Sequence, residues 1–172
     1  PEPGAAPQAG EVEVTTVTVT NPDQLQALVD ALKASMLVAF DTETTSLEAL
    51  HADLVGLAFA TEPGRAWYVP ISHHNQTTEL SREDIVAALK PLLEDPNIKK
   101  VGQNFKYDLN VLHRAGIQLA GIAHDTMLAS YVFHSTGTRH DMDSLAGHYL
   151  GRPTTSFESV AGQRVHVVAG SG

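Results

Sequence analysis

The sequence predicts one α/β domain in which helices flank a mixed central β-sheet. Its 172 residues match the usual length of a single domain. Strand-like segments dominate the first half of the chain and helical segments the second half, with some alternation between them. Hydrophobic residues make up 42% of the chain and charged residues 18%, which excludes wholesale disorder.

Alternating and apolar segments predict the strands. Residues 11–20 alternate and are rich in β-branched side chains. The continuous apolar run Met36–Phe40 predicts a strand buried on both faces. Further strands are expected at 54–60, 67–71 and 99–101. A turn at 62–64 joins two of them, so the centre of the chain is expected to form a meander that begins at the buried strand.

Capping residues followed by apolar positions at helical spacing predict the helices. The first helix follows Asn21 and Pro22, and the second runs from Ser81 to Glu94. A third is expected over 104–115, with Asn104 as its N-cap and a glycine directly after its end. Two more are expected at 125–134 and 141–150, each opened by an aspartate.

Composition and charge exclude several classes of function. The chain has no cysteine, which excludes disulfides, thiolate metal sites and cysteine nucleophiles. Its 20 acidic and 11 basic residues give a formal net charge of −9, so a nucleic acid would have to be met through local features such as bound cations. We see no secretory signal and no apolar stretch of membrane-spanning length, and we expect a cytoplasmic protein with no membrane partner.

Two acidic residues directly follow the apolar run. Residues two apart in a strand point to the same face, so Asp41 and Glu43 are expected side by side at the carboxyl end of this strand. A divalent cation would relieve their repulsion, and ligation by oxygen alone favours Mg²⁺ or Mn²⁺ over zinc. In the alternative, Asp41 caps a turn and Glu43 is solvated. The tripeptide by itself leaves both interpretations open.

A second polar cluster covers residues 102–108. If Asn104 is the N-cap, Asp108 lies about one turn into the helix, from where it can approach the strand end that bears Asp41. Lys106 in the same cluster is a candidate contact for a phosphate. Taken alone, the cluster is better explained as an ordinary cap with a solvated acid in the first turn.

Four segments together resemble a known family. LVAFDTETTSL, VGQNFKYDLNVL, GIAHDTMLASY and RHDMDSLA are similar to the 3′→5′ proofreading exonuclease domain of bacterial DNA polymerase I, in the DEDD exonuclease superfamily. The similarity extends over about residues 17–162. It implies an RNase H-like fold, with residues 12–162 as the exonuclease domain and 163–172 as an atypical tail. Residues 1–11 are expected to form a linker, because their start is rich in Pro, Gly and Ala and lacks periodicity.

The resemblance also implies a mechanism and a set of site residues. Asp41 and Glu43 match the first motif of the family and Asp108 the second, which makes all three catalytic ligands of two divalent ions, Mg²⁺ or Mn²⁺. The implied reaction hydrolyses the 3′-terminal phosphodiester and releases nucleoside monophosphates. Residues implied to contact the substrate strand are Thr44, Leu47, Gln103, Asn104, Arg139 and Phe157. Core packing is the alternative role of Leu47 and Phe157, and pairing with a nearby aspartate is that of Arg139.

One part of the family pattern is absent from the sequence. The third motif, Y-x-x-x-D, supplies a water-orienting tyrosine and a further metal ligand, and this sequence contains no such segment. The stretch QRVHVVAGSG after Gly162 does not match the family's continuation. We therefore expect a C-terminally incomplete domain, weakly active or inactive as a fragment.

The resemblance implies partners and leaves two alternatives. The implied substrate is a single-stranded DNA 3′ end, and the implied partner is the polymerase domain of the same parent chain, in a monomeric bacterial protein of the cytoplasm and nucleoid. The alternatives are a non-catalytic structural module of a polymerase and an RNA-trimming exonuclease of the same superfamily. The three carboxylates disfavour the first alternative, and RHDMDSLA disfavours the second.

Overall fold

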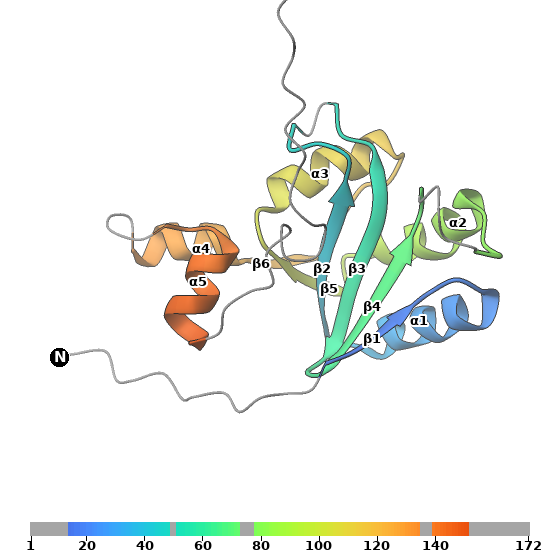
Figure 1. Ribbon diagram of the computed structural model, residues 1–172, viewed down its shortest axis with the longest axis horizontal. Coiled ribbons are helices and arrows are strands. Elements are labelled where there is room, and N and C mark those ends of the chain that lie inside the picture. Colours follow the sequence, from blue (N-terminus) through green and yellow to red (C-terminus); the bar gives the residue numbers. More distant parts are fainter. Residues whose placement is uncertain (1–13, 49–50, 73–77, 135–138, 152–172) are drawn as a thin grey trace, which may run out of the picture. The chain divides into compact units, whose positions relative to one another are not determined.

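The computed structural model describes residues 14–48, 51–72, 78–134 and 139–151. The chain divides into two compact units. The larger, residues 11–136, contains the six-stranded sheet and helices α1 to α4 (Figure 1). In the smaller unit, the described residues form α5, Met142–Leu145, and a π-helical turn, Ala146–Leu150. No helix in the described part of the chain is long and apolar enough to span a bilayer.

The sheet is mixed, as predicted, with the strand order β1-β4-β3-β2-β5-β6. β2, β3 and β4 form an antiparallel meander and lie side by side in Figure 1. β1 pairs in parallel with β4, β5 with β2, and β6 with β5. The strands are β1 Thr15–Thr18, β2 Leu37–Thr44, β3 Leu54–Glu62, β4 Arg65–Pro70, β5 Lys99–Gly102 and β6 Ile122–Asp125.

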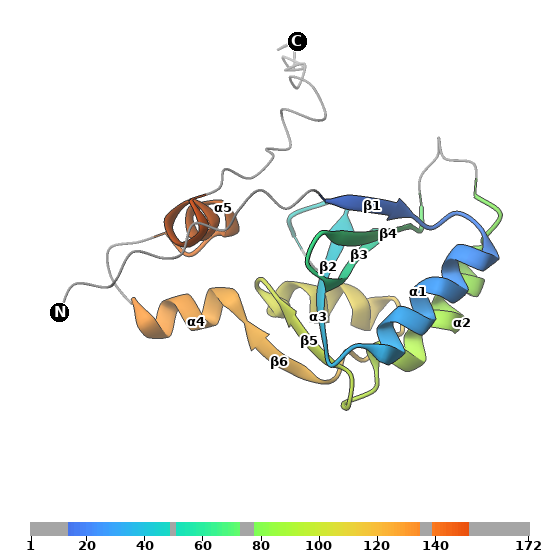
Figure 2. The ribbon, with the colours of Figure 1, turned by 90° about the horizontal axis from the view of Figure 1, so that it is seen from below.

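Three helices pack on one side of the sheet. They are α1 (Pro22–Ala34), α2 (Arg82–Leu93) and α3 (Phe105–Arg114), and Figure 2 shows them on the same side. Their apolar side chains form one core with alternate residues of the central strands. This core fixes α3 against β2, where the sequence places the acidic residues.

The strand β2 is buried on one face only, so the prediction of a strand covered on both faces is wrong. Val38 and Phe40 are 1% and 3% exposed, whereas Leu37 is 43% exposed. The helices pack against the face that carries Val38 and Phe40. The alternate side chains of β2 point to the other face, which the helices do not cover. A short apolar run cannot distinguish these two cases, because the number of helix layers is set by the rest of the chain.

Most of the predicted caps are confirmed. The side chain of Asn21 accepts a hydrogen bond from the Gln24 amide at 3.0 Å at the start of α1. Ser81 and Asp84 form a capping box at the start of α2. Asp125 caps α4, Thr126–Phe133, as expected. Asp141 caps α5, but the single helix expected over 141–150 is instead a short α-helix followed by the π-helical turn.

One prediction near α3 is wrong, and one strand beside it has no counterpart among the predictions. Asn104 does not cap α3 with its side chain, because its backbone adopts a left-handed conformation (φ 61°, ψ 53°). The carboxylate of Asp125 accepts hydrogen bonds from the amides of Asn104 and Phe105 instead. The strand β6, which ends at Asp125, was not predicted, because its four mostly exposed residues lack an alternating pattern.

A buried lysine closes the end of α2 next to β5. Nζ of Lys100 donates hydrogen bonds to the carbonyl oxygens of Leu92 (2.8 Å), Leu93 (3.2 Å) and Asp95 (2.9 Å). Burial lowers the pKa of Lys100 to about 8. These bonds satisfy carbonyl groups that have no partner within the helix, and they anchor the strand that pairs with β2.

Candidate active site

The carboxyl end of β2 carries Asp41 and Glu43 on the open face of the sheet. Thr42 lies between them and points to the opposite, buried face. Across the antiparallel pairing, Asp41 lies opposite Ala58 and Glu43 opposite Gly56. Both neighbours on β3 are small, and the ring of Tyr68 on β4 lies over Gly56.

Asp108 approaches the same strand from α3. It lies in the first turn of the helix and is only 2% exposed. The hydroxyl of Thr42 donates a 2.5 Å hydrogen bond to Oδ1 of Asp108. A buried threonine of the strand therefore fixes the orientation of a buried helix carboxylate.

Burial raises the pKa values of Asp41 and Asp108. Burial is the largest cause that raises the pKa of Asp41 to about 6, followed by the charges of Asp108 and Glu43. Burial also raises the pKa of Asp108, while the hydrogen bond from Thr42 opposes this shift. In the part of the chain that the structure describes, no basic side chain forms an ion pair with any of the three acids. The described basic side chains thus leave this negative charge uncompensated.

The donor chemistry of this site fits hard divalent cations, although the described side chains do not form a closed ligand cluster. All three acids offer carboxylate oxygens, which Mg²⁺ and Mn²⁺ prefer. Within the described residues, no three His, Asp or Glu side chains converge as a metal-binding group. Asp108 directs one of its oxygens to Thr42. Asp41, Glu43 and the remaining oxygen of Asp108 are the groups available to a cation.

Tyr107 fastens the loop that follows β2. Its hydroxyl contacts Oγ1 of Thr44 at 2.5 Å and donates a hydrogen bond to the Ser46 carbonyl. Thr44, a predicted substrate residue, is therefore tied to α3. Leu47, a second predicted substrate residue, lies in this loop with its side chain 96% exposed, which excludes its alternative role in the core.

Gln103 and Asn104 form a tight corner between β5 and α3. Oε1 of Gln103 accepts a hydrogen bond from the Thr126 hydroxyl. At Gly102 a Cβ atom would lie 2.7 Å from the Phe105 ring and 2.8 Å from the Phe40 carbonyl, so only glycine fits there. The corner brings two predicted substrate residues to the N-terminus of the helix that carries Asp108.

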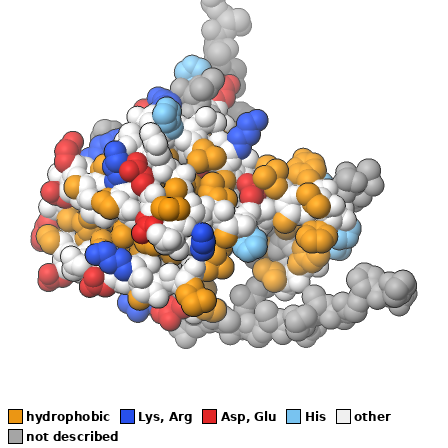
Figure 3. Space-filling view, turned by 180° about the vertical axis from the view of Figure 1, so that it is seen from behind, with side chains coloured by type: hydrophobic (Ala, Val, Ile, Leu, Met, Phe, Trp, Pro, Cys, Tyr) orange, Lys and Arg blue, Asp and Glu red, His pale blue; other side chains and the backbone are white. Residues whose placement is uncertain are grey.

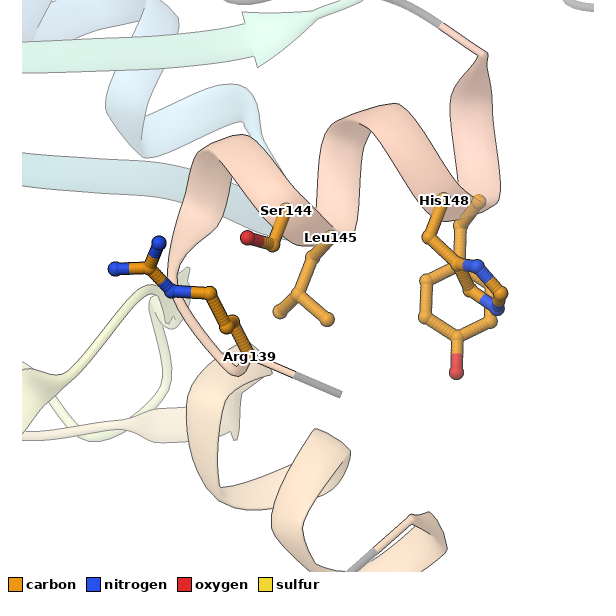
Figure 4. A pocket seen from close by; sticks show the side chains of 5 residues that line it. Arg139, Ser144, Leu145 and His148 are labelled. Atoms are coloured by element: carbon orange, nitrogen blue, oxygen red, sulfur yellow. The ribbon is translucent and has the colours of Figure 1, made fainter. Parts of the chain in front are cut away.

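The last two predicted substrate residues lie elsewhere in the chain. Arg139 belongs to the smaller unit, is 88% exposed at its side chain and pairs with Asp141 at 3.3 Å. It lines a pocket of about 190 Å³, and Figure 4 shows it with Ser144, Leu145 and His148 around this pocket. Phe157 lies outside the described residues.

Sequence reasoning missed three residues at the site. Thr42 has a recognisable signal, since it stands between two acids on a strand and must face the helix. Tyr107 has no sequence signal for its contact with the loop after β2, because that contact depends on how α3 packs. Tyr68 on β4 packs over Gly56, and burial followed by the charge of Glu43 raises its pKa. Tyr68 reaches the site because β4 pairs with β3 in a register that places Tyr68 opposite Ala58. This register could not be predicted from the sequence.

The sequence is similar to an exonuclease family and to DNA polymerases. Residues 16–166 match a family model described as 3′-5′ exonuclease. The chain is 49% identical over 166 residues to a DNA polymerase I of Pseudomonas aeruginosa, which covers 94% of this chain and 18% of that protein. It is 38% identical over 165 residues to a DNA polymerase I of Rhizobium leguminosarum, covering 85% and 16%. The chain thus spans less than a fifth of the length of these relatives.

Solved structures share the fold. The POL domain of Pol1 from M. smegmatis, in complex with a DNA primer-template and dNTP, has a TM-score of 0.68 and 27% identity, covering 81% of this chain and 23% of that one. Escherichia coli RNase D, an exoribonuclease, has a TM-score of 0.62 and 22% identity, covering 85% and 36%. Trypanosoma brucei RNase D has a TM-score of 0.69 and 16% identity, covering 89% and 55%. These similarities confirm the RNase H-like exonuclease fold expected from the sequence.

Proposed function

Because the chain belongs to the 3′→5′ exonuclease family of DNA polymerase I, we propose that Asp41, Glu43 and Asp108 are its catalytic carboxylates. The observation that carries this proposal is the meeting of acids from β2 and α3 with no basic partner in the described structure. In a purely structural domain, repulsion between these acidic side chains would only lower stability, and apolar residues in their place would stabilise the fold better.

The proposed cofactors are two divalent ions, Mg²⁺ or Mn²⁺, held by these three residues. When bound, such ions lower the pKa of the attacking water and stabilise charge on the leaving 3′ oxygen. Asp41 and Glu43 offer oxygens from the open face of β2, and Asp108 offers one from α3. Thr42 keeps the Asp108 carboxylate oriented, and the raised pKa of Asp41 means that a cation displaces a proton there in mildly acidic solution.

The proposed substrate is a single-stranded DNA 3′ end. The exposed side chain of Leu47 is free to pack against a terminal base, and Tyr107 holds its loop in place. Thr44, Gln103 and Asn104 border the same end of the sheet and are proposed to contact the strand. On the face seen in Figure 3, Lys and Arg side chains are interspersed with Asp and Glu. Cations at the carboxylates are therefore the proposed means of receiving a phosphate.

The relatives support DNA over RNA and a larger parent protein. Two are DNA polymerases of which this chain spans less than a fifth, so we propose that a polymerase domain of the same bacterial parent delivers the DNA end. Arg139 and Phe157 are proposed to contact the substrate strand as well. A monomeric state and a location in the cytoplasm and nucleoid belong to the same proposal. Because the sequence contains no Y-x-x-x-D segment, we propose that the chain by itself hydrolyses DNA slowly.

Release of mononucleotides from a single-stranded DNA oligonucleotide with Mn²⁺ tests this function. Wild type should release nucleotides from the 3′ end. In Asp41→Ala the rate of release should fall by more than the roughly 10–100-fold that is typical when a residue outside the ligand set is changed. Asp30→Ala, on the exposed face of α1, is the matched control and should behave as wild type. Faster release from RNA of the same sequence would favour RNA trimming. Equal rates for wild type and Asp41→Ala would contradict the proposal and favour a structural module.

A further inference from the structure

We propose that Asp125 is a positioning residue for the carboxylate site, because it sets the N-terminus of α3 and through it the place of Asp108. This inference rests on the proposed function, which it deepens by adding a residue outside the ligand set. The sequence pattern identifies Asp125 only as the cap of its own helix, α4.

The carboxylate of Asp125 joins two helices. Oδ1 accepts hydrogen bonds from the amides of Met127 (3.0 Å) and Leu128 (3.2 Å), which cap α4. The same atom accepts from the amide of Asn104 at 3.1 Å, and Oδ2 accepts from the amide of Phe105 at 2.8 Å. One side chain therefore satisfies amide groups at the N-termini of both α3 and α4. A simple N-cap needs only the amides of its own helix.

The second pair of hydrogen bonds holds an unfavourable backbone conformation. Asn104 is the only non-glycine residue with a positive φ in the described part of the chain. Left-handed backbone is less favourable for residues that carry a Cβ than for glycine, although asparagine tolerates it better than most, and it persists where the surroundings hold it. Asp125 supplies this restraint, since it binds the amide of Asn104 itself and that of the next residue. The side chain of Asn104 makes no capping bond and stays available at the corner.

The hydrogen bonds to Asp125 also fix the position of Asp108, one of the three proposed catalytic carboxylates. Phe105, bound by Asp125, is the first residue of α3, and Asp108 lies in the first turn of the same helix. The neighbouring Thr126 holds Gln103 and the Gly102 carbonyl (3.2 Å) on the other side of the corner. A shift of the α3 N-terminus therefore moves Asp108 away from Thr42, and Gln103 and Asn104 away from their proposed contacts. Asp125 acts on the site through these residues and also through its own charge, which adds to burial in raising the pKa of Asp108, and it is not itself assigned to the substrate.

Mn²⁺ affinity of the 172-residue chain, measured by water-proton relaxation, tests the proposal. Asp125→Ala should weaken Mn²⁺ binding by about tenfold or more, the range typical of residues that orient metal ligands. Asp125→Asn retains one acceptor oxygen and should have an intermediate effect. Ser81→Ala is the matched control, because it removes the side-chain cap of α2 without any contact to α3. It should lower the melting temperature while leaving Mn²⁺ affinity within about twofold.

Two further readouts separate positioning from general stability. Asn104→Gly relieves the left-handed strain, so adding it to Asp125→Ala should restore part of the Mn²⁺ affinity. The Thr42 methyl resonance reports the bond between Thr42 and Asp108 without metal, and it should move in Asp125→Ala but not in Ser81→Ala. Wild-type Mn²⁺ affinity in Asp125→Ala would overturn the proposal. If wild type itself bound no Mn²⁺, the proposed function would fail, and an unmoved Thr42 methyl would then overturn the positioning role separately.

Discussion

The two faces of β2 differ in role: one packs into the core and the other carries acidic side chains. Val38, Phe40 and Thr42 lie on the buried face, and the first two belong to the core. Asp41 and Glu43 lie on the open face with their charges uncompensated by the described basic residues. The two-residue period of a strand lets alternate residues of β2 serve both the core and the acidic site.

Thr42 is where the two faces become coupled. It is buried like a core residue, yet its hydroxyl binds Asp108, which the open-face acid Asp41 senses electrostatically. The buried face therefore determines how the acids of the open face and of α3 are arranged. Changes on the buried face should therefore act first on stability, and changes on the open face on charge and binding.

The largest loss of stability is expected from Phe40→Ala. The Phe40 ring packs against Phe59 and Phe105 with ring centroids 5.3 and 6.4 Å apart. Its removal should lower the free energy of unfolding by about 3–5 kcal/mol. Leu37→Ala, on the open face of the same strand, should lower it by less than about 1 kcal/mol. Urea denaturation measures both, and equal losses would show that the two faces are packed alike.

Thr42→Val should have the next largest effect. Valine keeps the shape of threonine but removes the donor to a buried carboxylate, which should lower the free energy of unfolding by about 1.5–3 kcal/mol at pH 7.5. The pKa of Asp108 should rise further, because the hydrogen bond that opposes its shift is gone. Thr16→Val on the exposed strand β1 is the control and should stay within about 0.5 kcal/mol. A neutral Thr42→Val would argue against the coupling of the two faces.

Asp41→Asn should stabilise the chain in the absence of divalent cations. Its pKa is about 6 in the folded protein against 3.8 for the ordinary group, so the folded state binds more protons between these values. Wild type should therefore lose stability as the pH rises through this window, on the order of 1 kcal/mol or more in total. Asn removes this part of the dependence. Thermal unfolding from pH 4 to 7.5 measures it, and a wild-type profile that rises across the window would be inconsistent with the repulsion.

Leu47→Ala should leave stability nearly unchanged. Its side chain is almost fully exposed, so the free energy of unfolding should stay within about 0.5 kcal/mol. Nucleotide release from single-stranded DNA should nevertheless fall, because the proposed contact with a terminal base is lost. Measuring both quantities on the same preparation separates binding from folding. A large loss of stability would mean that Leu47 packs against the protein.

The fold and the acidic pair were predictable because they depend on local patterns. The alternation in β2 places Asp41 and Glu43 on one face, and the serine and acid at 81 and 84 indicate a capping box. The strand β6 and the corner at Asn104 were not predictable, because both depend on Asp125 and on pairing across the sheet. Burial of one face of β2 likewise depends on how many helix layers the chain supplies. Local sequence predicts where the acids lie, whereas contacts distant in sequence determine how they are held.

The central claim is that Asp41, Glu43 and Asp108 together bind divalent cations. Proton release on Mn²⁺ binding is its most direct test. At pH 6 Asp41 is half protonated, so Mn²⁺ binding should release about half a proton from this residue. The release should fall in Asp41→Asn, where Asp108 still keeps a raised pKa, and it should stay unchanged in Asp30→Ala. Mn²⁺ binding that releases no protons, or the same release from Asp41→Asn, would contradict the account.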